Sequence, residues 1–198
     1  MLVRLLGALS DGVARLERAA LFVLAAAIVG LILTNVVTRS MARAIYWVDE
    51  LAIYAMIWMV FVGASLALRQ RRHVRVSALI LALPAGAARA VELVVDALLL
   101  ALGLFLVWAA WIWYDPLTLA RHGFDAGTFA GQTFNFIYDE PTSTLGLRKF
   151  WIWLVMPLFA ATSSLHAAAN LAERLAGLAP DPAAPSAGAA NPGEEAAR

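Results

Sequence analysis

The residue types that could perform acid–base chemistry lie at the two ends of one apolar stretch. Asp49 and Glu50 directly precede this stretch, and His73 follows it among a run of arginines. A carboxylate close to a histidine is a common arrangement for general acid–base catalysis. Here, however, the two ends are about 18 residues apart, and a helix of that length extends about 27 Å at about 1.5 Å per residue. These groups therefore cannot form one active site.

Ligands for a metal or a haem are also few. The chain has no cysteine, which excludes disulfides, thiolate metal sites and iron–sulfur clusters. Bis-histidine haem ligation needs two imidazoles at one depth inside a bundle, whereas His73, His122 and His166 are all predicted at interface or loop positions. The sequence contains no phosphate-binding loop, dinucleotide fingerprint or metalloprotease helix. We therefore expect no cofactor, no metal and no nucleic-acid partner.

The composition indicates an integral membrane protein. Hydrophobic residues make up 62% of the 198 residues and charged residues only 15%, which is too apolar for a soluble domain of this size. The apolar residues come in runs of about 20, the length that a helix needs to cross a bilayer. We therefore predict an all-α integral membrane protein with four transmembrane helices, at about residues 19–38, 49–68, 91–114 and 150–169.

The two ends of the chain differ from the predicted spans. In residues 1–18, leucines recur at helical spacing on one face and arginines fall mostly elsewhere. This pattern predicts an amphipathic helix lying in the headgroup layer, although a polar extension of the first span is the alternative. Residues 171–198 are rich in alanine, proline and glycine, a composition that predicts a disordered tail.

Charged residues flank the short connection between the first two spans. Arg39 and Arg43 end the first span, and Asp49 and Glu50 begin the second, which is the sign that the helix dipole favours at each terminus. One interpretation is mutual neutralisation at a wet interface, where an exposed pair contributes about 0–1 kcal/mol. The alternative is a docking or gating cluster.

Glu92 and Asp96 lie one helical turn apart near the start of the third span. Acidic residues in a membrane helix are costly and suggest a functional role by default. Their position beside a basic segment instead favours structural ion pairs with the arginines just before them. Trp58 and Gly63 lie in the second span, and aromatic and small residues there are typical of helix packing.

The arginines also predict the orientation of the chain. The connection between the second and third spans contains no acid, and its five arginines are Arg69, Arg71, Arg72, Arg75 and Arg89. The positive-inside rule places this connection, and with four spans both termini, in the cytoplasm. The long connection 115–149 then faces outward. Because it is rich in aromatic residues, we expect it either to fold against the bundle or to serve in contact.

The predicted spans contain few groups that could bind a solute. Segments 51–68 and 150–169 contain no acid, lysine or arginine, and no internal repeat is evident. An ion-coupled carrier usually needs polar or broken-helix sites near the midplane of repeated halves. The sequence thus argues against translocation by this chain alone and favours a bundle that holds or orients another component.

Several residues stand in a recognisable order over roughly residues 15–170. They are Asn35-x3-Arg39, Trp47-x-Asp49-Glu50, Trp58, Gly63, Arg69-x3-His73-Val74-x-Val76 and Pro84. This ordered set resembles the small membrane subunit of tripartite ATP-independent periplasmic (TRAP) transporters, the DctQ-like family. Two positions depart from the family pattern. Asp49 stands where a glutamate is frequent, and Ser77 stands where an aspartate is frequent, so a salt bridge from the latter position is not expected.

The resemblance implies a non-catalytic subunit of the bacterial inner membrane. Such a subunit scaffolds a large permease subunit, which carries the sodium-coupled substrate site and moves by an elevator-type motion. A periplasmic solute-binding protein delivers an organic acid. Contacts with the large subunit or with membrane phospholipid are implied for Asn35, Arg39, Trp47, Asp49, Glu50, Trp58, Arg69, Arg72, His73, Glu92 and Asp96. Two alternatives stay open: a membrane-anchor subunit of a redox enzyme complex, and an autonomous small carrier.

Overall fold

The structure, a computed structural model, describes residues 1–70 and 84–178. Four long helices in this part of the chain are apolar enough to cross a membrane, which confirms the predicted all-α membrane fold. The helices are α1 (Leu2–Ser40), α2 (Tyr46–Arg69), α4 (Ala85–Tyr114), α5 (Pro116–Arg121), α6 (Ala126–Thr133), α7 (Phe150–Trp153) and α8 (Val155–Leu175). The candidate residues Arg72 and His73 lie outside the described residues, so their roles stay predictions.

The first helix is longer than a single span. α1 runs through 39 residues without a break, so the segment 1–18 and the first span form one helix of about 58 Å. The hydrocarbon core of a bilayer is only about 30 Å thick. Part of α1 must therefore lie outside the hydrocarbon core, or the helix must be steeply tilted. The interfacial position of residues 1–18 stays a prediction.

Prolines explain two other helix boundaries. Pro84 is the N-cap of α4, which begins several residues before the predicted start at residue 91. Proline is suited to a helix start because it has no N–H to donate inside the helix. Pro157 lies within the fourth span, and it cannot donate to the carbonyl of Trp153. The helix is interrupted just there, between α7 and α8.

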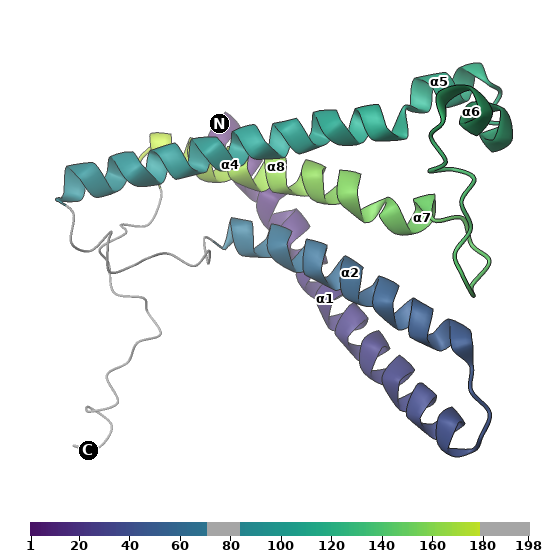
Figure 1. Ribbon diagram of the computed structural model, residues 1–198. Helices are drawn as coiled ribbons and strands as arrows, with labels where there is room; N and C mark the ends of the chain where they lie inside the picture. Colours follow the sequence, from purple (N-terminus) through teal and green to yellow (C-terminus); the bar gives the residue numbers. More distant parts are fainter. Residues whose placement is uncertain (71–83, 179–198) are drawn as a thin grey trace, which may run out of the picture.

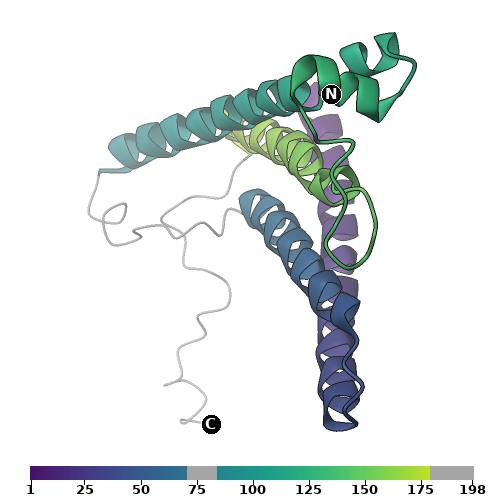
Figure 2. The same ribbon diagram turned by 45° about the vertical axis from the view of Figure 1, so that its right-hand side comes forward.

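The long helices form two antiparallel pairs. α1 packs along α2, α4 packs along α8, and α8 also contacts both α1 and α2. Figures 1 and 2 show that the two pairs meet at one end and diverge toward the other. We call the meeting region the convergent end; it holds the first half of α1 and the last turns of α2 and α8. The divergent end holds the α1–α2 connection and residues 115–149.

The long connection at the divergent end is folded. Its side chains form a cluster with the end of α4, made of Tyr114, Ala126, Phe129, Ile137 and Tyr138. The hydroxyl of Tyr138 donates to the Tyr114 carbonyl over 2.7 Å, and burial raises the pKa of this phenol. Asp125 caps α6 by accepting from the backbone N–H of Thr128. This hydrogen bond, together with one from the Thr128 side chain, lowers the pKa of Asp125.

Candidate functional site

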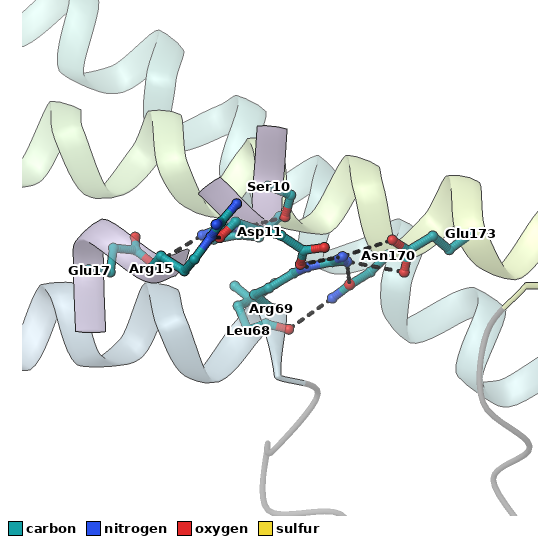
Figure 3. A network of polar contacts seen from close by, with 9 residues as sticks. Ser10, Asp11, Arg15, Glu17, Leu68, Arg69, Asn170 and Glu173 are labelled. Carbon is teal, nitrogen blue, oxygen red and sulfur yellow. Dashed lines mark hydrogen bonds and ion pairs between the residues drawn. The ribbon is translucent and has the colours of Figure 1, made fainter. Parts of the chain in front are cut away.

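Arg69 joins three helices at the convergent end. Its guanidinium lies 2.8 Å from Asp11 of α1 and 2.9 Å from Glu173 of α8, and it also donates to Asn170 over 2.9 Å. Asn170 in turn donates to the Leu68 carbonyl over 2.8 Å. Figure 3 shows these groups converging on Arg69 from α1, α2 and α8. The arginine side chain is only 12% exposed, so it is committed to contacts within the chain.

A second polar group joins α1 to α8. His166 is fully buried, with Nδ1 lying 2.6 Å from the Ser10 hydroxyl and Nε2 lying 3.1 Å from the Glu17 carboxylate. A serine, a histidine and a carboxylate can form a catalytic triad, but here the serine is also completely buried. No substrate can reach that hydroxyl in this arrangement. The group therefore serves helix association, and both ring nitrogens of the histidine are engaged in it.

Arg174 makes the corresponding link between α8 and α4. It lies 2.6 Å from Asp96 and forms an ion pair with Glu92 as well. All three side chains are at least 89% buried, with exposures of 11%, 9% and 6%. The predicted ion-pair role of the two acids fits this geometry. The described partner, Arg174, comes from the end of the fourth span; Arg71, Arg72 and Arg75, before α4, lie outside the described residues.

Three predicted residues meet at the divergent end. The Asn35 side chain donates to Asp49 and accepts from Arg39 Nε over 2.9 Å. Arg39 also forms an ion pair with Asp49 at 2.7 Å, so the three side chains form a triangle of contacts. The arginine and the aspartate are 59% and 42% exposed. The triangle therefore fastens the α1–α2 hairpin at a wet surface.

Glu50 turns away from this triangle and binds the connection before α7. Its carboxylate accepts the backbone N–H groups of Ser143, Thr144 and Leu145 over 2.7, 2.6 and 3.0 Å. It also accepts the hydroxyls of Thr144 and Tyr54. This connection leads through α7 into α8, whereas α2 belongs to the other pair, so Glu50 links the two pairs where they diverge.

The two candidate tryptophans have different surroundings. The indole N–H of Trp58 donates to the Ile152 carbonyl over 2.9 Å, at the interruption between α7 and α8. Non-helical backbone at membrane depth needs such partners because lipid offers none. Trp47 is 46% exposed at the start of α2, a position typical of an interfacial anchor.

Among the described residues, the predicted candidates other than Trp58 lie at the convergent or the divergent end. Sequence analysis missed the partners of these candidates at the convergent end, which are Asp11, Asn170, Glu173 and Arg174. It also missed the separate group of Ser10, Glu17 and His166. One available signal was the spacing of Gly7, Ser10, Ala14 and Glu17, a buried stripe on one side of α1. In residues 1–70 and 84–178, no three His, Asp or Glu side chains are placed to hold a metal ion.

This arrangement defines a class of protein: a small helical membrane subunit whose charged groups fasten helices to one another at two ends. The chain matches the family model of the tripartite ATP-independent periplasmic transporters, DctQ component, over residues 28–177. The match covers most of the chain, which therefore belongs to the DctQ family, the small permease subunit of TRAP transporters. No curated protein matches the chain.

Family membership confirms the resemblance seen in the sequence and establishes the membrane and the process in which the chain acts. The chain is a transmembrane transport component of the bacterial inner membrane. The DctQ family is one part of a tripartite transporter, which also contains a large permease subunit and a periplasmic binding protein.

Proposed function

We propose that this chain is a non-catalytic scaffold for the large, sodium-coupled subunit of its transporter. In this proposal the large subunit moves an organic acid that the periplasmic binding protein delivers. The small subunit holds the static part of that machine in the membrane, in contact with the large subunit and with phospholipid. It neither catalyses a reaction nor carries the solute.

The observation that carries the proposal is the position and use of the charged groups. Among the described residues, the ion-paired charges lie at the convergent or the divergent end, and all of these pairs except Lys149 with Glu140 join different helices. A solute path needs polar groups near the midplane that can exchange partners with the substrate. Arg69 and Arg174 instead hold several partners at once and are 12% and 11% exposed.

The apolar faces of the long helices supply surface for a partner or for lipid. α4 exposes a series of large side chains along its length, among them Val94, Leu98, Leu102, Phe105 and Trp108. The second half of α1 exposes others, among them Phe22, Val29, Ile32 and Val36. Exposed apolar patches of this extent mark contact with membrane or protein. The arginine-rich convergent end faces the cytoplasm in the proposed orientation.

Copurification with the large subunit tests the proposal. We expect the wild-type chain to recover that subunit from membranes, and Glu50→Lys to recover severalfold less. A lysine cannot accept the three N–H groups that Glu50 binds, so the link between the two helix pairs is lost. Glu194→Lys, in the predicted tail, makes the same charge change and should recover the wild-type amount. Equal recovery with both variants contradicts this ranking, and no recovery with the wild type contradicts the proposal.

A further inference from the structure

The first half of α1 has three distinct faces. One is buried in the bundle and consists of Gly7, Ser10, Ala14 and Glu17. A second is apolar and exposed, and its leucines are Leu2, Leu5, Leu9 and Leu16, each between 52% and 72% exposed. The third is exposed and polar, and its residues are Arg4, Asp11, Arg15 and Arg18. At 100° per residue the polar face lies roughly opposite the leucines.

α1 is unbroken, so its first half continues the line of the part that crosses the membrane. The exposed leucines are an apolar surface for membrane or a partner, and the arginines can reach the headgroups. The buried stripe packs on the rest of the bundle. The next segment, residues 19–38, contains no charged side chain and extends about 30 Å at about 1.5 Å per residue. This uncharged part alone is long enough to cross the hydrocarbon core.

The polar face borders a hollow at the convergent end with a volume of ≈ 610 Å³. Its lining residues are Asp11, Ala14, Arg15, Arg18, Arg69, Gln70 and Glu173. Three arginines oppose two carboxylates, and Arg69 already binds both carboxylates. Within residues 1–70 and 84–178, Arg15 and Arg18 form no ion pair, although Arg15 donates to the Asp11 carbonyl at 3.4 Å. The hollow therefore carries an excess of one positive charge on two exposed guanidinium groups.

We propose that this hollow binds the phosphodiester of an anionic phospholipid of the inner leaflet, with phosphatidylglycerol as its representative. Guanidinium groups suit phosphate oxygens because their N–H groups can bind two oxygens at once. The excess charge matches the single negative charge of a phosphodiester. The uncharged segment 19–38 sets the depth of α1, so that Arg15 and Arg18, just before it, lie at the level of the phosphates. The assignment to the inner leaflet rests on the proposed orientation of the transporter subunit.

Native mass spectrometry of the full chain in detergent, titrated with defined lipids, tests this site. We expect saturable binding of phosphatidylglycerol and much weaker binding of phosphatidylcholine and phosphatidylethanolamine. The double variant Arg15→Gln/Arg18→Gln should bind phosphatidylglycerol roughly 30-fold more weakly, since each arginine near anionic lipid contributes about a fivefold effect. Arg15→Lys/Arg18→Lys should restore part of the affinity, because lysine keeps the charge but cannot bind two oxygens in the same planar geometry. Arg43→Gln/Arg121→Gln removes two exposed charges at the divergent end and should bind as the wild type does.

Three results overturn the site: equal losses in the two Gln double variants, equal wild-type binding of phosphatidylcholine or phosphatidylethanolamine, or displacement of the lipid by millimolar inorganic phosphate. The last result would indicate a simple anion site. Copurification with the large subunit is measured on the same preparations. Weak lipid binding with normal copurification in the Gln variant supports the lipid site and shows that the fold is intact. Lipid binding by a wild-type chain that recovers no large subunit supports the site and refutes only the scaffold.

Discussion

Arg69 and Asp49 form ion pairs at opposite ends of α2, and the difference in exposure makes these pairs contribute differently to stability. The pair of Arg69 with Glu173 is largely removed from water, with exposures of 12% and 20%, whereas the Asp49 pair with Arg39 is about half exposed. Breaking a buried pair leaves an uncompensated charge behind and is costly. An exposed pair loses little because water and salt already screen it.

Arg69→Gln should therefore lower the free energy of unfolding by roughly 3 kcal/mol, because the largely buried pair of Arg69 with Glu173 is broken. Asp49→Asn should lower it by less than about 1 kcal/mol. Thermal or denaturant unfolding of the purified chain in one detergent measures both. Equal costs for the two substitutions would contradict the distinction drawn between the two ends.

For single residues, the sequence predicted which side chains form ion pairs better than it predicted which residues they pair with. The pairing of Arg39 with Asp49 across a short hairpin follows from sequence order, since the two helices must lie side by side. The pairing of Arg174 with Asp96 does not, because the fourth span was expected to end near residue 169 and α8 continues to Leu175. The contact of Glu17 with His166 depends on how α1 crosses α8, which hydropathy does not encode.

Among the elements, α4 and α8 pack most closely at one glycine. A Cβ added to Gly103 would lie 2.6 Å from the Ser164 hydroxyl and 3.2 Å from its Cα. The hydroxyl can rotate away, but the backbone atom cannot move without separating the helices. Small residues permit this close approach, as is usual in membrane helix pairs.

Gly103→Ala should thus destabilise the chain by about 1–3 kcal/mol through overpacking. Gly30→Ala is the matched control, because no atom lies within 4 Å of the added Cβ in α1. In an exposed helix interior, alanine is normally better than glycine by about 1 kcal/mol, so this control should be neutral or stabilising. Unfolding transitions that shift in the same direction for both variants would argue against close packing at residue 103.

The existence of the helices was predictable, whereas the way they join was not. Runs of apolar residues predicted four helices able to cross a membrane, because the bilayer sets the length of a span. The continuity of α1 through residue 18 matches only the alternative interpretation, since amphipathic and fully apolar helical patterns look like separate elements. The fold of residues 115–149 depends on contacts such as Tyr138 with Tyr114, which no short periodicity reveals.

For the whole molecule, the proposed lipid site requires that the convergent end face the cytoplasm. The chain has no cysteine, so single introduced cysteines report their side of the membrane cleanly. Gln132→Cys on α6 should react with a membrane-impermeant maleimide in intact spheroplasts. Ser186→Cys in the predicted tail should react only after lysis. The reverse labelling would overturn the proposed orientation and with it the inner-leaflet assignment of the lipid site.

In the proposed function, this subunit supports transport without carrying the solute. Proteoliposomes containing the large subunit, this chain and the binding protein should accumulate the organic acid when a sodium gradient is imposed. Proteoliposomes containing this chain alone, with the same binding protein and gradient, should accumulate no more than empty liposomes. Sodium-driven uptake by this chain alone, above the level of empty liposomes, would contradict the account.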